Sequence, residues 1–433
     1  TTGASNTSVG SGALYANTTA SYNTAVGYAS LGANTTGDQN VALGTEALKA
    51  NTTAIHNTAI GYRAMYTHVT GNDNTAVGQE ALYTNNGGTG NTALGRRALQ
   101  LNTTAISNTA VGEQALKANT SGNWNTAVGQ GALSANQTGQ LNVAIGVNAM
   151  TAVNTGSGHV AIGATALEDN TTGTVNVAVG ASALAQNTTG SHNTALGHEA
   201  AKLQTTASNN VAIGEQTLYT NLTGTSNTAV GTGALYTNTA SSNTAVGFEA
   251  LVANTQGEKN VALGALSLDA NLTGSKNTTI GYNTMSLSTT AANNTAIGTS
   301  AGYNLSTGAN NTLLGYDAGR SGSPGGTVTT GSNQMNLGDE NIAAANIQVD
   351  WTVASDVRDK TDFTALDLGL DFVKALAPVT YKWDKRSKYG DKNAEDYDLN
   401  AQTPDGTHKE DWLDIGFKAQ EVEALEIAAG YDK

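Results

Sequence analysis

The sequence predicts an all-β fold: a parallel β-solenoid or β-roll of 17-residue coils, followed by a small α+β domain. The first observation is the pentapeptide Asn-Thr-Ala-Val-Gly at residues 74–78, which returns in closely related form every 17 residues. The second is strictness, because 19 units carry Gly at the fifth position, from Gly10 to Gly315, and Val, Ile or Leu at the fourth. The third is composition, because 51 glycines and only 12% charged residues suit stacked small side chains. Self-similarity at a fixed short period is the sequence signature of a solenoid.

Each coil is numbered from the Asn of this pentapeptide as position one. Thr-Ala-Val at positions two to four is a short β-strand, and the Gly at position five suits a corner with positive φ or close backbone approach. Ala-Leu at positions eight and nine is predicted to be a second short strand, and the Asn-Thr-Thr-Gly segment at 34–37 a turn. One step, from Asn227 to Asn243, has 16 residues, and we place the missing residue in this turn. At the strand spacing of ~4.8 Å, the 19 coils make a rod of roughly 90 Å.

A single coil is not stable alone, because it buries only about four small apolar side chains. Stacking adds backbone hydrogen bonds and a column of Asn side chains whose amides can bond along the ladder. Positions three and four are adjacent, so their side chains point to opposite faces of the strand, yet both are apolar almost throughout. We therefore expect one face to pack inside the coil and the other against a neighbouring chain, which predicts an oligomeric rod.

Charge and composition exclude several classes of function. The net charge is −14, and the residues from Asp339 onward carry 21 acidic and 11 basic side chains, which is −10 of that total. Binding of nucleic acid through a basic surface is therefore not expected. The chain has no cysteine, so disulfides and thiolate metal sites are excluded. We find no signal peptide and no apolar run long enough to insert in a membrane. Because the chain starts with the tail of a repeat, we expect it to be a fragment of a longer protein.

The candidate chemical groups inside the repeats form no catalytic or metal-binding pattern. The Gly-rich segment 87–90 lacks the Lys and the strand-to-helix context of a phosphate-binding loop. Acids such as Glu46 and Glu80 recur beside the Gly corner without forming a facing pair, so a glycosidase dyad is not indicated. The histidines fall in different columns, so we expect no metal and no cofactor. Tyrosines share positions six and ten, where they either pack at the corners or bind sugar rings.

After the repeats the composition changes. A loop at 319–326 breaks the pattern. The segments expected beyond it are a degenerate final coil (332–338), a strand (347–353), a helix (366–376) that Pro378 ends, a strand (379–383) and a second helix (419–425). The predicted division is a β-solenoid rod over 1–319, a last coil and neck over 320–354, and a separate domain over 355–433.

The repeat resembles known proteins. Residues 57–65, Asn-Thr-Ala-Ile-Gly-Tyr-Arg-Ala-Met, are similar to the head repeats of trimeric autotransporter adhesins, and similar repeats occur in phage tail fibres. The resemblance covers residues 1 to about 319. It implies a left-handed parallel β-roll that is three chains wide, although the period here is longer than the adhesin one.

Three C-terminal motifs carry a second resemblance. They are Ser-Asp-x-Arg-x-Lys at 355–360, Pro-Val-x-Tyr-x-Trp at 378–383 and Gly-Phe-x-Ala-Gln-Glu-Val at 416–422. By spacing alone, Ser355 reads as a helix N-cap followed by acids. The order of the three motifs, however, resembles the endosialidase-type intramolecular chaperone at the C-terminus of phage tail fibres and tailspikes. That family usually continues through further helices, so we expect the domain to be cut short at Lys433.

The resemblance implies a single self-cleavage of each chain. The chaperone trimerises, guides assembly of the fibre before it and cuts the Ala354–Ser355 bond, with Ser355 as nucleophile and Lys360 as its base. Ser-Lys pairs are a recognised variant of nucleophilic catalysis, and the Lys must be neutral to accept the proton. Arg358 is a cation that could lower the pKa of Lys360. Asp359 stands where many members have Leu, and its carboxylate favours a charged Lys360.

The sequence therefore predicts a fibre protein that is at most a single-turnover serine autoprotease. We expect a phage tail fibre in the virion, a homotrimer, with a host-surface glycan or protein as receptor. The alternative is a bacterial trimeric adhesin-like rod on the cell surface without proteolysis. A third class, a glycan-degrading fibre, lacks its carboxylate pair.

Overall fold

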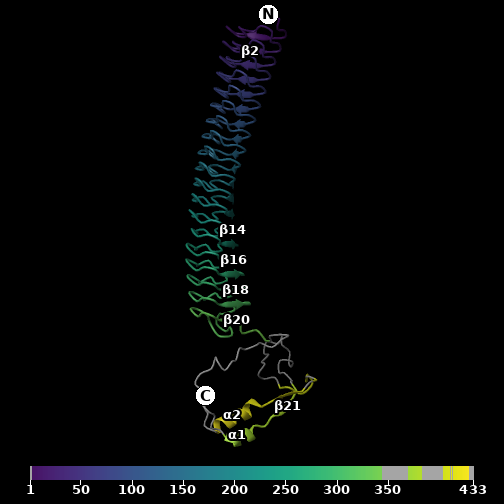
Figure 1. The fold of residues 1–433 in the computed structure, drawn as a ribbon, viewed down its shortest axis with the longest axis vertical. Helices are drawn as coiled ribbons and strands as arrows, with labels where there is room; N and C mark the ends of the chain where they lie inside the picture. Colours follow the sequence, from purple (N-terminus) through teal and green to yellow (C-terminus); the bar gives the residue numbers. More distant parts are fainter. Residues whose placement is uncertain (1, 344–368, 383–402, 410, 412, 429–433) are drawn as a thin grey trace. The chain divides into compact units, whose positions relative to one another are not determined.

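The computed structural model describes residues 2–343, 369–382, 403–409, 411 and 413–428. The chain divides into two compact units, Thr1–Asn341 and Ile342–Lys433. The first unit is the long rod of stacked coils in Figure 1. The separate neck predicted for residues 320–354 stays a prediction.

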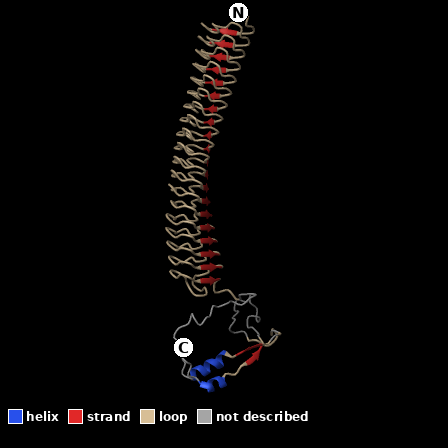
Figure 2. Cartoon of the chain, viewed as in Figure 1, coloured by secondary structure: helices blue, strands red, loops and turns tan. Residues whose placement is uncertain are grey.

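The rod is one parallel β-sheet of twenty short strands, which run along one side of the coils in Figure 2. The strands are β1 (Thr7–Val9), β2 (Thr24–Val26), β3 (Val41–Leu43), β4 (Thr58–Ile60), β5 (Thr75–Val77), β6 (Thr92–Leu94), β7 (Thr109–Val111), β8 (Thr126–Val128), β9 (Val143–Ile145), β10 (Val160–Ile162), β11 (Val177–Val179), β12 (Thr194–Leu196), β13 (Val211–Ile213), β14 (Thr228–Val230), β15 (Thr244–Val246), β16 (Val261–Leu263), β17 (Thr278–Ile280), β18 (Thr295–Ile297), β19 (Thr312–Leu314) and β20 (Met335–Leu337). Each strand pairs with the next at equivalent positions, as in Thr75↔Thr92. The predicted all-β parallel solenoid is confirmed.

The two faces of each strand differ as the sequence predicts. In β10 the central residue Ala161 is fully buried inside the coil, whereas Ile162 is 38% exposed on the outside. The same alternation holds along the sheet, because neighbouring residues of a strand point to opposite faces. The outer side chains of position four are therefore aliphatic and open to solvent in the single chain.

The second strand predicted at positions eight and nine is wrong. Ala81 and Leu82 are fully buried, but they lie in a turn that spans positions six to eleven. Leu82 has a φ of +52° and Glu80 a φ of +55°, in the left-handed region, which no β-strand uses. The chain needs these two left-handed residues to reverse direction while it keeps Leu82 inside the core.

The glycine of position five has the positive φ that the sequence predicts. Across the 19 coils its φ lies between +116° and +143°. A side chain there would also collide with the next coil, because a Cβ on Gly78 would lie 2.5 Å from the carbonyl oxygen of Gly95. The positive φ and the close contact together exclude every residue other than glycine at position five.

Two ladders of buried asparagines connect the coils. At position one, the backbone N–H of Asn91 donates to Oδ1 of Asn74 at 3.0 Å, and Nδ2 of Asn91 donates to the carbonyl of Ala105 at 2.8 Å. At position twelve, Nδ2 of Asn102 donates to Oδ1 of Asn85 at 2.7 Å. The predicted Asn column is confirmed, and the second column adds an equivalent line of amides.

The 16-residue coil leaves the ladder intact. The backbone N–H of Asn243 donates to Oδ1 of Asn227 at 2.9 Å, as in the other coils. Nδ2 of Asn238 donates to the carbonyl of Ala240, two residues ahead, whereas most other coils reach three residues ahead. The deletion therefore lies in the predicted turn.

The degenerate coil predicted at 332–338 closes the rod. There the backbone N–H of Gln334 donates to Oδ1 of Asn311 at 2.9 Å, and β20 pairs with β19.

The second unit contains α1 (Gly369–Ala375), β21 (Val379–Tyr381), β22 (Asp414–Gly416) and α2 (Ala419–Ala428). The two predicted helices and the strand before Trp383 are therefore present. The strand predicted at 347–353 lies outside the described residues.

Candidate functional site

Two of the three C-terminal motifs meet in a β-hairpin. β21 and β22 pair antiparallel, with Val379 opposite Gly416 and Tyr381 opposite Asp414. The ring of Tyr381 lies against Gly416, because a Cβ built on that glycine would lie 3.2 Å from Cε1 of the ring. A larger residue at 416 would push the ring away, so the glycine of the third motif makes room for the tyrosine of the second.

A cavity of about 450 Å³ opens between this hairpin and the start of α2. Its lining residues come from the same two motifs: Val379, Thr380, Tyr381, Phe417, Lys418 and Gln420. The first turn of α2 is held by the carbonyl of Lys418, which accepts from the backbone N–H groups of Glu421 and Val422. Nζ of Lys418 also pairs with Oε1 of Glu421 at 2.6 Å.

The second unit exposes large apolar side chains in the single chain. Within its described part, α2 buries no residue. The exposed apolar residues are Val373, Leu413, Ile415, Phe417 and Ile427, and Ile415 is 81% exposed. Three of these residues, Leu413, Ile415 and Phe417, come from β22 and the residues directly beside it.

The predicted catalytic pair lies outside the described residues. This applies to Ser355, to Lys360 and to the Ala354–Ser355 bond, as well as to the neighbouring Arg358 and Asp359. Their roles stay predictions.

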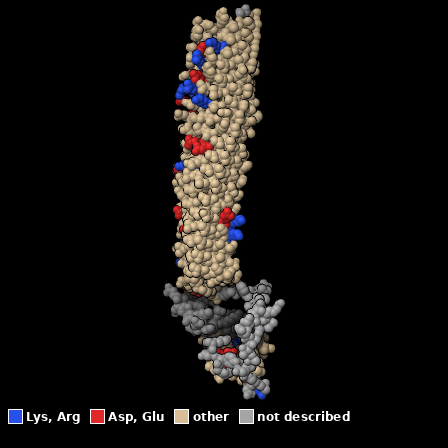
Figure 3. Space-filling view, turned by 60° about the vertical axis from the view of Figure 1, so that its left-hand side comes forward, with Lys and Arg blue, Asp and Glu red and all other residues tan. Residues whose placement is uncertain are grey.

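The outer face of the rod carries no charge along its whole sheet. In all 19 coils position two is Thr or Val and position four is Val, Ile or Leu. The 22 charged residues of positions 1–338 fall only at coil positions six, seven, ten, eleven, sixteen and seventeen. Figure 3 shows them as small groups separated by broad uncharged surface. The sheet thus forms a continuous uncharged stripe of threonine and aliphatic side chains, here called the sheet face.

Several charged groups of the rod pair with one another, either within one coil or across neighbouring coils. The carboxylate of Glu46 accepts from Nζ of Lys49 and from Nε of Arg63, each at 2.7 Å. These hydrogen bonds, that from Lys49 first, lower the pKa of Glu46. Next to them, the rings of Tyr66 and Tyr83 stack with their centroids 5.2 Å apart. This arrangement is corner packing, and it occupies faces that a sugar ring would need.

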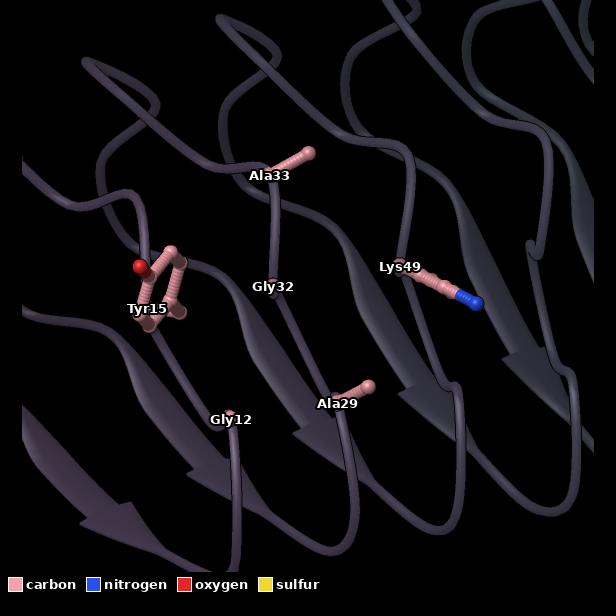
Figure 4. A pocket seen from close by; sticks show the side chains of 6 residues that line it. All are labelled: Gly12, Tyr15, Ala29, Gly32, Ala33 and Lys49. Atoms are coloured by element: carbon pink, nitrogen blue, oxygen red, sulfur yellow. The ribbon is translucent and has the colours of Figure 1, made fainter.

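A shallow hollow of about 290 Å³ lies near the N-terminal end of the rod (Figure 4). It forms because position ten carries Gly32 between the larger side chains of Tyr15 and Lys49. Its floor consists of small residues, and the amine of Lys49 already pairs with Glu46. Apart from Lys49, the one polar side chain of this lining is Tyr15, which is 87% exposed.

Two histidines were not recognised from the sequence as members of the buried ladders. His159 replaces Asn at position one and His68 replaces Asn at position twelve, and both are fully buried. Within the described ranges, no group of three potential metal ligands comes together. The signal that could have found them is their place in the columns, because position one is Asn in each of the other coils and position twelve is Asn in most of them.

Comparison with known proteins identifies the C-terminal region. Residues 355–431 match a family described as chaperone of endosialidase, and the match begins at Ser355. No curated protein matches the chain. Across the described segments, none of the helices is both long and apolar enough to cross a membrane. A parallel solenoid of 17-residue coils followed by this region fits the class of tail-fibre-like proteins with an intramolecular chaperone.

Proposed function

We propose that this chain is the subunit of a homotrimeric fibre, of the phage tail-fibre kind, whose C-terminal region guides assembly and then cleaves itself from the fibre. The observation that carries the proposal is the chaperone-of-endosialidase match over 355–431, directly after the rod. In this function the fibre is part of a virion and contacts a host-surface glycan or protein.

The rod has a physical need for an assembly factor. Its coils are so alike that a strand can pair one coil out of register and still bury Ala at position three and Leu at position nine. Until its coils are stacked, the chain exposes apolar side chains and unpaired strand edges. A chaperone that holds three chains together at one end would start the stacking from a single defined register.

Exposed apolar surface in both units supports a homotrimer. The sheet face runs along all 19 coils without a charge, so a partner must present a matching apolar surface of the same length. A second copy of this chain carries the same sheet face and therefore offers a matching surface of the same length. The exposed side chains around Ile415 and Phe417 give the C-terminal unit a contact surface of its own.

The proposed cleavage hydrolyses one peptide bond. Lys360, in its neutral form, takes the hydroxyl proton of Ser355, and Oγ attacks the carbonyl carbon of Ala354. The peptide nitrogen of Ser355 leaves with a proton as a free amine, which leaves an ester between Ala354 and Oγ. Water then hydrolyses this ester to the carboxylate of Ala354 and the Ser355 hydroxyl.

The test is expression of the full-length native chain, followed by denaturing electrophoresis, N-terminal sequencing and mass measurement in solution. We expect two bands, the smaller beginning at Ser355, and a native mass of three rods. Ser355→Ala and Lys360→Ala should each give one uncleaved band and an unchanged trimer. Thr361→Ala is the matched control, because it removes a neighbouring hydroxyl and should leave cleavage intact.

Two results would contradict the proposal separately. If the protein is a monomer in solution, the proposed trimer is wrong. A native chain that stays one band, with Ser355→Ala making no difference, removes the autoprotease and leaves an uncleaved adhesin-like rod as the better description.

A further inference from the structure

His159 occupies a position that is Asn in each of the other 18 coils. It lies in position one of the coil that spans residues 159–175, here called coil 10, and its side chain is fully buried. Its backbone N–H donates to Oδ1 of Asn142 at 3.0 Å, so the ladder reaches it unbroken from the coil before.

The imidazole reproduces the hydrogen bonds of the missing amide. Nδ1 accepts from the backbone N–H of Asn176 at 3.1 Å, which is the task of Oδ1 in the other coils. Nε2 lies 2.7 Å from the carbonyl oxygen of Gly173 and donates to it, which is the task of Nδ2. One ring nitrogen must accept and the other must donate, so the geometry requires the neutral ring with its proton on Nε2.

Protonation would break this arrangement. A proton on Nδ1 would face the backbone N–H of Asn176, which belongs to the main chain and cannot turn round to accept. Among the described residues, the ring has one further polar neighbour, Nδ2 of Asn170 at 3.1 Å from Nε2, and it is also a donor. The imidazolium would therefore lose one bond and gain no acceptor.

The surroundings offer the charged ring no compensation. The coil before, 142–158, has no titratable side chain, and the coil after, 176–192, has only His192. Coil 10 itself carries Glu168 and Asp169, and no ion pair joins either carboxylate to His159 in the described rod. Burial lowers the pKa of His159 to about 4.

His68 provides an internal contrast. Its Nδ1 lies 2.9 Å from the carbonyl oxygen of Asn85 and 3.1 Å from Nδ2 of the same residue. Its Nε2 lies 2.5 Å from the carbonyl oxygen of Gly71. The ring can accept from the amide when neutral and donate to both carbonyls when protonated. Burial lowers the pKa of His68 too, but each protonation state finds partners.

We propose that His159 makes coil 10 an acid-sensitive opening point of the rod, at which the stacked coils separate locally when the ring takes up a proton. This inference is independent of the proposed fibre function. The direction follows from linkage: the folded ring resists protonation and the opened ring has an ordinary pKa of about 6.5. The contribution of His159 to stability is therefore complete above about pH 6.5 and is lost as the pH falls toward about 4.

The test is hydrogen exchange of the assembled protein at pH 7 and pH 5, corrected for the intrinsic exchange rates. Between these pH values, peptides from 142–192 should open about 20-fold more often in the native protein. In His159→Asn, which restores the ladder residue of the other coils, this increase should disappear. The variant keeps Glu168, Asp169 and His192, so the difference between the two proteins reports His159.

His68→Asn is the matched control, and it should leave the increase at 142–192 unchanged. The proposal is overturned if coil 10 exchanges equally at both pH values, or if His159→Asn keeps the full increase. Because the variant carries the residue found in the other coils, we expect it to fold, and circular dichroism at pH 7 checks this.

Discussion

At the scale of the residue, the buried asparagines show how hydrogen bonds offset the cost of burying polar side chains. A buried amide is costly unless its groups are bonded, and at position one Asn91 bonds both to Asn74 of the coil before and to the turn carbonyl of Ala105. Oδ1 of Asn108, for example, accepts from the backbone N–H of Asn125 at 2.9 Å. The ladder therefore connects one coil to the next through side chains as well as through the sheet.

We predict that Asn108→Ala lowers the free energy of unfolding by about 1–3 kcal/mol, because it leaves the buried N–H of Asn125 without an acceptor. Gln79→Ala, at an exposed position six, should change it by less than about 0.5 kcal/mol. Denaturant titration measures both. Equal effects at the two sites would show that the ladder adds nothing beyond the sheet.

At the scale of the element, the last coils exchange large and small residues between two core positions. Position nine is Gly302 and Gly319 in the last two regular coils, where earlier coils carry mostly Leu or Met. Position three of the final regular coil is Leu313, where most others carry Ala. A Cβ on Gly302 would lie 2.7 Å from Cδ1 of Leu313, so this leucine fills the space that the absent side chain leaves. The repeat pattern breaks in these coils, but the combined volume of the side chains at the two core positions is kept.

We predict that Leu313→Ala costs about 2–5 kcal/mol of unfolding free energy through the cavity it opens. Gly302→Leu alone should cost about 1–3 kcal/mol by overpacking against Leu313. The double variant should lose less unfolding free energy than the two single variants lose together, because it restores the Ala and Leu pair of the other coils. A double-mutant cycle by denaturant titration measures this coupling, and additive effects would contradict the volume exchange.

For the whole molecule, the proposed association of copies depends on the sheet face. Ile162 lies on this face, whereas Ala164, two residues later, is exposed at position six, where other coils carry Arg or Glu. The two sites share one coil and differ in whether they lie on the sheet face. They therefore separate a requirement for apolar contact from a general intolerance of charge.

We predict that Ile162→Lys weakens association of the rod by at least tenfold, because a lysine would be buried without a partner between copies. Ala164→Lys should associate as the native chain does. Light scattering over a concentration series measures the effect, and circular dichroism checks that both variants keep the sheet. Unchanged association of Ile162→Lys would place the contact between copies elsewhere.

The sequence by itself determined the parallel solenoid, its 17-residue period and the place of the shortened coil. It could do so because each column repeats one physical requirement: Gly10 to Gly315 need positive φ, and the asparagines need buried partners. The same reading predicted both helices and the strand of the C-terminal unit. It also named Ser355 and Lys360, whose roles rest on the family match and stay predictions.

Only the tertiary structure decided what depends on contacts between coils or between distant segments. Leu82 looks like a strand residue in sequence, and its left-handed φ is visible only in the folded coil. The fit of Leu313 against Gly302 and of Tyr381 against Gly416 depends on residues that touch across the chain. In the sequence, His159 is only an exception in a column of asparagines. The structure shows that one of its ring nitrogens faces an acceptor and the other a donor. Local pattern encodes backbone and burial, whereas complementary shape and proton placement exist only once the coils are stacked.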